Sequence, residues 1–70
     1  MRIAFYIQMK LNQFLKFQGL VSTGGEAKQL INSGLITVNG IVETRRGRKL
    51  CPGDLVSFEN QDYILAHSDL

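Results

Sequence analysis

Gly34-Leu35-Ile36-Thr37-Val38-Asn39-Gly40-Ile41-Val42-Glu43 is the most informative segment of this 70-residue sequence. Apolar and β-branched residues flank Asn39-Gly40 on both sides. Asn-Gly between two such runs favours a tight type I′ turn, because both central residues of that turn need a positive φ. The segment therefore predicts a β-hairpin with strands over residues 35–38 and 41–43.

A second hairpin is predicted further along the chain. Pro52-Gly53 suits the centre of a type II turn, and Asp54 follows it. Residues 55–58 and 63–66 are rich in strand-forming side chains, with Asn60-Gln61 between them. These residues predict two further strands that are joined near Asn60-Gln61.

The first of two predicted helices precedes the hairpins. Leu11, Phe14 and Leu15 recur at helical spacing, which predicts a helix over residues 11–18. Gly19 follows this run and favours the end of the helix.

The second helix is predicted to begin at Thr23, because Thr23 and Glu26 fit a capping box. In that motif the Thr23 hydroxyl accepts from the amide of Glu26, and the Glu26 carboxylate accepts from the amide of Thr23. Gly34 is the expected residue beyond the end of the helix. The apolar stripe of this helix consists of Ala27, Leu30 and Ile31.

Together these elements predict an α+β fold. Residues 2–8 are rich in β-branched and aromatic side chains and add a strand before the helices. The predicted architecture is two short packed helices with a small curved, mainly antiparallel sheet. A chain of this length is one domain, here residues 1–70. The side chains of Phe14, Phe17 and Phe58 are expected in its core.

The charges of the chain are unevenly distributed. The formal net charge is +2, but residues 1–50 hold all eight Lys and Arg residues and only two carboxylates, Glu26 and Glu43. Residues 51–70 hold four carboxylates and no Lys or Arg. The densest cluster is Arg45-Arg46-Gly47-Arg48-Lys49. Such a cluster is either a solvated loop or a surface that binds a polyanion, nucleic acid above all.

The composition argues against several other classes. Cys51 is the single cysteine and His67 the single histidine, so we expect no disulfide framework, no metal site and no cofactor. The apolar run over residues 3–7 is shorter than the ~7–15 residues of a signal-peptide core. No run approaches the ~18 apolar residues of a membrane span. We therefore expect a cytoplasmic protein that has neither a membrane partner nor a small-molecule substrate.

The order of these motifs resembles a known family. A pair of helices leads into Gly-x-x-x-Val-Asn-Gly, and Pro-Gly-Asp follows. This pattern resembles the RNA-binding domain named after small-subunit ribosomal protein S4, also called the alpha-L RNA-binding motif. The resemblance is strongest over residues 10–58. Two segments, Thr23 to Lys28 and Glu43 to Leu50, are similar to the small stand-alone bacterial members of the YaaA/YbcJ type. The segments that carry the resemblance are Leu11-Asn12-Gln13-Phe14-Leu15, Ser22 to Ile31, Gly34 to Gly40, Glu43 to Leu50 and Pro52-Gly53-Asp54.

The resemblance implies that the two helices and the adjoining loop form an RNA-binding face. Asn39 is only a turn residue in this interpretation. Many relatives carry a basic residue before the second helix, where this chain has Gly24-Gly25. The amides of Thr23, Gly24 and Gly25 either bind a phosphate there or are occupied by the capping box. The other implied contacts are Lys10, Lys16, Lys28, Gln29, Arg45, Arg46, Arg48 and Lys49.

The implied function is non-catalytic binding of structured RNA, either ribosomal RNA or a ribosome-assembly intermediate. Lys and Arg would displace condensed counterions from the phosphates, and A-form RNA is recognised mainly by shape and backbone. The expected partner is thus structured RNA, including a ribosome or its subunit. A protein-interaction adaptor that uses the same fold is the alternative. An enzyme is not expected, because such domains accompany RNA-modifying catalytic domains and the sequence holds no second domain.

Overall fold

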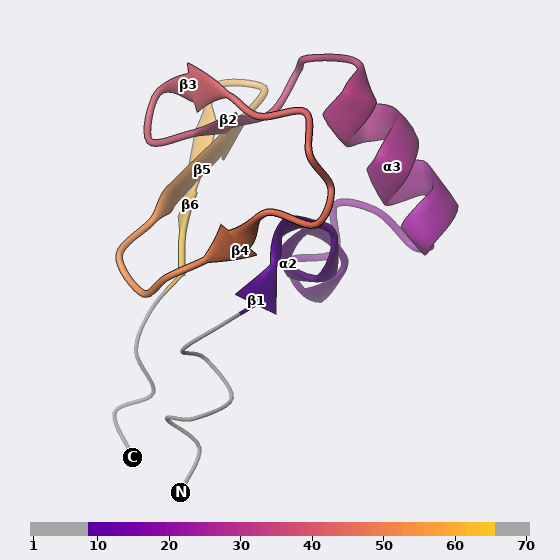
Figure 1. Cartoon of the computed structure of the whole chain (residues 1–70), viewed down its shortest axis with the longest axis horizontal. Helices are drawn as coiled ribbons and strands as arrows, with labels where there is room; N and C mark the ends of the chain where they lie inside the picture. The colour runs from indigo at the N-terminus through magenta and orange to yellow at the C-terminus, as the bar shows by residue number, and fades with distance from the viewer. Residues whose placement is uncertain (1–8, 66–70) are drawn as a thin grey trace, which may run out of the picture.

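The computed structural model describes residues 9–65 of the chain and consists of two short helices and six strands (Figure 1). The strand predicted over residues 2–8, and Ala66 of the second hairpin, lie outside the described residues. The elements are β1 (Met9–Lys10), α2 (Leu11–Phe17), α3 (Gly24–Asn32), β2 (Thr37–Val38), β3 (Ile41–Val42), β4 (Lys49–Leu50), β5 (Leu55–Phe58) and β6 (Gln61–Ile64).

The strands form two antiparallel sheets. The larger sheet has the order β3-β2-β5-β6, and β1 pairs with β4 in a separate two-stranded sheet. In Figure 1 the larger sheet lies on one side of the molecule and α3 on the other, with α2 and the β1–β4 pair between and below them. This arrangement confirms the predicted α+β fold.

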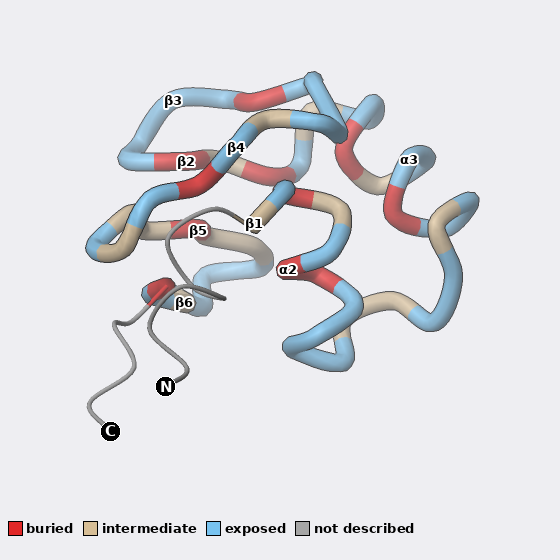
Figure 2. The backbone as a smooth tube through the Cα atoms, turned by 60° about the horizontal axis from the view of Figure 1, so that its bottom comes forward, coloured by how far each residue is buried: buried red, intermediate tan, exposed pale blue. Residues whose placement is uncertain are grey.

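The core is formed where the two helices meet the sheets. Buried positions recur on both helices and on the central strands (Figure 2). The apolar stripe of α2 is buried as predicted, and on α3 Ala27 and Ile31 are buried whereas Leu30 is half-buried. The buried residues of the hydrophobic core are Leu11, Phe14, Leu15, Ala27, Ile31, Ile36, Val38, Leu50, Val56 and Leu65.

The predicted core placement of the phenylalanines is correct for Phe14 only. Phe58 is half-buried against the core, and Phe17 is 67% exposed. Phe17 is the last residue of α2, two positions beyond the buried Leu15. Each helical residue is rotated by about 100° from the one before, so Phe17 lies roughly 110° from the centre of the stripe formed by Leu11, Phe14 and Leu15, outside the buried face.

The start of α3 differs from the predicted capping box in one of its two hydrogen bonds. The Thr23 hydroxyl accepts from the Glu26 amide at 3.1 Å, as predicted. The Glu26 carboxylate accepts from the amide of Ser22 at 2.7 Å, not from that of Thr23. Thr23 has the extended backbone (φ −134°, ψ 163°) that is usual for an N-cap residue. Gly34 follows the helix with φ 83°, as expected for its end.

The strands differ from the prediction in several places. β2 and β3 are shorter than the predicted strands over residues 35–38 and 41–43, and β1 was not predicted. β6 begins at Gln61, because Glu59 and Asn60 adopt positive φ values and close a two-residue turn. The prediction had centred this turn on Asn60-Gln61 and started the last strand at Tyr63. β4 was not predicted, since a two-residue strand shows no alternation and Lys49 had been assigned to the basic loop.

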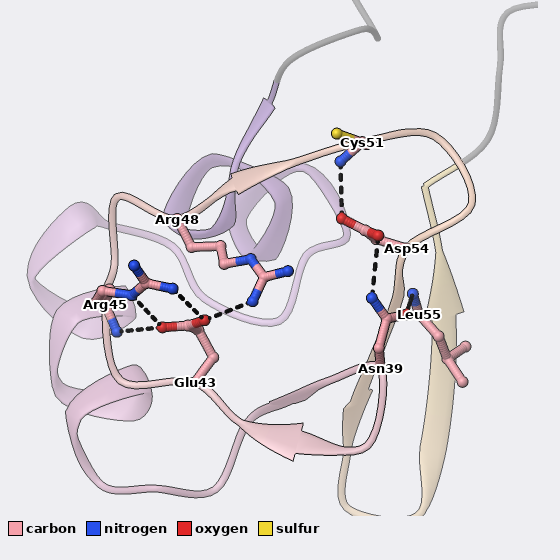
Figure 3. Close-up of polar contacts among 7 residues, drawn as sticks. All are labelled: Asn39, Glu43, Arg45, Arg48, Cys51, Asp54 and Leu55. Carbon is pink, nitrogen blue, oxygen red and sulfur yellow. Dashed lines mark hydrogen bonds and ion pairs between the residues drawn. The ribbon is translucent and has the colours of Figure 1, made fainter.

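Asn39 is more than a turn residue. It adopts φ 54° in the predicted Asn-Gly turn, and its side chain also joins the two hairpins (Figure 3). Its Nδ2 donates to Asp54 Oδ1 at 3.1 Å, and its Oδ1 accepts from the Leu55 amide at 3.0 Å. The other carboxylate oxygen of Asp54 accepts from the Cys51 amide at 2.8 Å, across the predicted Pro-Gly turn. These hydrogen bonds hold the pKa of Asp54 below its usual value, the Cys51 amide contributing most.

Replacing Asn39 by glycine tests this side-chain link, because glycine keeps the positive φ of the turn. We expect Asn39→Gly to lower the free energy of unfolding by about 2 kcal/mol, through the loss of two hydrogen bonds. Urea unfolding followed by circular dichroism measures this change. Asn60→Gly is the matched control, since Asn60 also has a positive φ but no side-chain hydrogen bond within residues 9–65. Equal losses in the two variants would contradict the role given to Asn39.

Candidate nucleic-acid interface

The loop between β3 and β4 is folded around a buried carboxylate, that of Glu43. The Glu43 amide donates to the Ile36 carbonyl at 3.0 Å, which extends the β2–β3 pairing by one step. Residues paired across an antiparallel ladder share a face, so Glu43 lies on the same face as the buried Ile36. Only 6% of Glu43 is exposed.

Two arginines of the loop bind this carboxylate (Figure 3). Arg45 donates through Nε to Oε2 at 2.9 Å and through Nη2 to Oε1 at 3.2 Å, and its backbone amide donates to Oε2 at 3.1 Å. Arg48 donates through Nη1 to Oε1 at 2.8 Å. Four hydrogen bonds therefore close the loop on Glu43.

The arginines determine the charge state of the buried group. Hydrogen bonds from Arg45 and then Arg48 lower the pKa of Glu43 from 4.5 to about 2, against the opposing effect of burial. The same contact raises the pKa of the Arg45 guanidinium. Glu43 is thus ionised at neutral pH. Arg45 and Arg48, which the sequence assigns to RNA, serve first as partners of Glu43.

The basic loop is also attached to the first helix. The carbonyls of Arg48 and Arg46 accept from the amides of Leu11 and Asn12, at 2.8 and 3.1 Å. These amides belong to the first turn of α2, where no intrahelical acceptor is available. Figure 1 shows the connection from β3 to β4 passing beside α2. The side chains of Arg46 and Arg48 therefore begin next to the start of this helix.

The structure brings five of the predicted contacts together. Lys10 and Lys49 are opposite each other in the β1–β4 pair, next to the attached loop. We call Lys10, Arg45, Arg46, Arg48 and Lys49 the loop cluster. Glu43 neutralises part of its charge, but Lys10, Arg46 and Lys49 form no ion pair with any described residue.

Three other predicted contacts lie on the helices. Lys16 is in the last turn of α2, and Lys28 and Gln29 are in α3. All three are exposed, and no ion pair joins them to another part of residues 9–65. The structure does not connect them to the loop cluster, and their contact with RNA stays a prediction.

The start of α3 carries a hydrogen-bonded cap. The Thr23 hydroxyl and carbonyl accept from the amides of Glu26 and Ala27, each at 3.1 Å. The Glu26 carboxylate places a negative charge in the first turn of the helix. These cap bonds use the amides of Ser22, Glu26 and Ala27, so the expectation that the cap occupies the amides of Thr23, Gly24 and Gly25 is wrong. Phosphate binding by Gly24-Gly25 stays a prediction.

Residues 9–65 hold neither a side-chain group suited to a metal ion nor a helix suited to cross a membrane. Over residues 9–65, His, Cys, Asp and Glu side chains form no group of three that could hold a metal ion. Neither helix in this range has the length and apolar character needed to cross a bilayer.

The fold and its attached basic loop define a small α+β domain of the type that the sequence resembles. The family model of the S4 domain matches residues 6–66. The chain therefore belongs to the S4 domain family.

Two relatives of similar size support this assignment. The chain is 43% identical over 49 residues to RlbA of Bacillus subtilis strain 168, a protein named as a candidate ribosome maturation protein. This match covers 70% of the chain and 69% of RlbA. The chain is also 40% identical over 50 residues to YbcJ of Escherichia coli K12, named as a candidate RNA-binding protein, and 71% of each protein is covered.

A solved structure shares the fold. Ribosomal protein S4e of the 30S subunit from Thermoplasma acidophilum superposes with a TM-score of 0.60 at 17% sequence identity. The match covers 83% of this chain but 30% of S4e. At this identity the likeness concerns the fold alone.

The lowered pKa of Glu43 predicts an acid-sensitive loop. Because the pKa in the folded protein lies below the ordinary value of 4.5, ionised Glu43 stabilises the fold above that pH. This contribution is lost as the pH falls from 4.5 toward 2. We expect Glu43→Gln to lower the free energy of unfolding by about 2 kcal/mol at neutral pH, because the arginines lose their charged partner.

Urea titrations from neutral pH down to the pKa of Glu43, about 2, measure this difference. The difference in free energy of unfolding between wild type and Glu43→Gln should become smaller as the pH falls across this range. Glu59→Gln is the matched control, since Glu59 is exposed and forms no ion pair with a described residue. If the difference in free energy of unfolding between wild type and Glu43→Gln did not change with pH, the lowered pKa of Glu43 would be contradicted.

Proposed function

We propose that this protein binds structured RNA without catalysing a reaction, and that the loop cluster is its main contact with the RNA backbone. The RNA is ribosomal RNA or a ribosome-assembly intermediate. Membership of the S4 domain family and the names of the relatives RlbA and YbcJ support the proposal that the ligand is RNA. The loop cluster supports the placement, because it gathers five cations on and beside a loop that two backbone hydrogen bonds attach to α2.

The physical basis is the replacement of counterions. Each phosphate that a Lys or Arg neutralises releases a condensed cation, and the entropy of that release drives binding. A loop that is already held by Glu43 and α2 loses little conformational entropy when RNA arrives. Arg46 is the best single probe, since its side chain is exposed and forms no ion pair with a described residue.

Arg45 and Arg48 are poor probes of RNA contact. Removing either one leaves the buried Glu43 with one arginine, so the loop would change along with the charge. Reversing Arg45, Arg46 and Arg48 together would combine the two effects. A single substitution at Arg46 separates binding from folding.

The test is binding of wild type and Arg46→Gln to a folded ribosomal RNA fragment over a salt series. Four to six phosphate contacts predict a slope of log K against log salt of roughly −3 to −5. Arg46→Gln should reduce the slope by about one and weaken binding about five- to tenfold near 100 mM salt. Gln61→Glu is the matched control, since it changes the net charge by the same amount at the far β5–β6 turn.

Each part of the proposal has its own contrary outcome. No binding of folded RNA by wild type at low salt would contradict RNA binding itself. Equal binding by Arg46→Gln and wild type would contradict the role of the loop cluster. Mass spectrometry of the RNA after incubation tests for catalysis, and a modified nucleotide would show that the chain is an enzyme.

A further inference from the structure

Two lysines face each other directly in the smaller sheet. Lys10 of β1 and Lys49 of β4 are Cα partners in the antiparallel register. The Lys10 amide donates to Gln13 Oε1 at 3.2 Å, whereas the next amide, that of Leu11, donates to the Arg48 carbonyl at 2.8 Å. Lys10 and Lys49 are therefore the non-hydrogen-bonded pair of this ladder. In such pairs the Cα atoms are about 4.5 Å apart and the side chains are closest.

Both lysines extend from the same face of the ladder. Their neighbours Met9 and Leu50 also oppose each other, and Leu50 is fully buried while Met9 packs against the core. Successive residues of a strand point to opposite faces, so Lys10 and Lys49 lie on the solvent side. Both are exposed. The two ammonium groups thus share one region of solvent.

No described carboxylate forms an ion pair with Lys10 or Lys49. The two Glu43 oxygens are bound to Arg45 and Arg48, and those of Asp54 accept from Asn39 and Cys51. Like charges directly opposite each other destabilise a ladder. The free protein therefore carries a local repulsion that a bound anion would relieve.

We propose that Lys10 and Lys49 together bind a single phosphodiester group, each ammonium donating to one of its two non-bridging oxygens. This inference rests on the proposed function and specifies the chemical group that one part of the loop cluster takes. We call Lys10 and Lys49 the clamp. The attached loop places Arg46 beside the clamp, where Arg46 contacts a different phosphate. The clamp links binding to stability, because the repulsion lowers the stability of the free protein and the phosphate removes it.

The free protein gives the first test. In phosphate-free buffer of low ionic strength, Lys10→Gln and Lys49→Gln should each raise the melting temperature by roughly 2–4 °C. The double variant should gain no more than either single variant, because one substitution already removes the repulsion. Lys28→Gln is the control, since Lys28 is an exposed helical lysine with no cross-strand neighbour. The gains should shrink at about 1 M salt, where charges are screened within about 3 Å.

Binding to the folded ribosomal RNA fragment gives the second test. Lys10→Gln, Lys49→Gln and the double variant should each reduce the salt slope by about one, because the pair neutralises one phosphate. Affinity should fall about five- to tenfold in each single variant near 100 mM salt, and little further in the double variant. Arg46→Gln combined with Lys49→Gln should instead reduce the slope by about two.

The outcomes separate this inference from the proposed function. If wild type binds RNA and the Lys10→Gln and Lys49→Gln variants bind equally well, the clamp is wrong while RNA binding stands. A double variant whose slope falls by about two also overturns the shared phosphate. Single variants that melt at or below the wild-type temperature overturn the repulsion. If wild type binds no folded RNA, the proposed function itself fails.

Discussion

The ion pairs between Glu43 and the arginines of its own loop are the interaction on which the candidate interface depends. The β2–β3 register directs this carboxylate inward, next to Ile36, where an unpaired charge would be costly. Arg45 and Arg48 remove that cost and fold the chain back on itself. The turn that results brings the carbonyls of residues 46 and 48 to the open amides of α2. One buried acid thereby attaches a basic loop to a helix.

This arrangement changes the meaning of the charge pattern. The net charge of +2 conceals a basic half and an acidic half, and the densest basic run lies within residues 45–49. Within that run, two of the four cations are held by an acid of the same loop. The cations that remain unpaired among residues 9–65 are those carried by β1, the loop and β4, together with two on the helices. A count of charges in sequence identifies the region, and the ion pairs identify which side chains are available there.

Local sequence rules predicted most of the fold because they depend on backbone geometry at single positions. The Asn39 turn, the Thr23 cap and the end of α3 just before Gly34 were all predicted from one or two residues. Features that depend on residues distant in sequence were missed. The β4 strand exists only because β1 is beside it, and the buried state of Glu43 requires the pairing with Ile36. The candidate site was located by composition, but its internal pairing was not predictable without the register.

The same register creates a conflict between folding and binding. A protein selected only for stability would gain from a neutral or acidic residue opposite Lys10, since opposite charges across a ladder stabilise it. Lys49 at that position instead concentrates positive charge on a part of the surface that the fold holds rigidly by two backbone hydrogen bonds to α2. A flexible loop could spread its charges apart in the free state and would then gain less when an anion arrives. In the proposed clamp, rigidity would keep the repulsion in place until a polyanion relieved it, and a small domain with modest net charge would then still favour a closely spaced phosphate backbone.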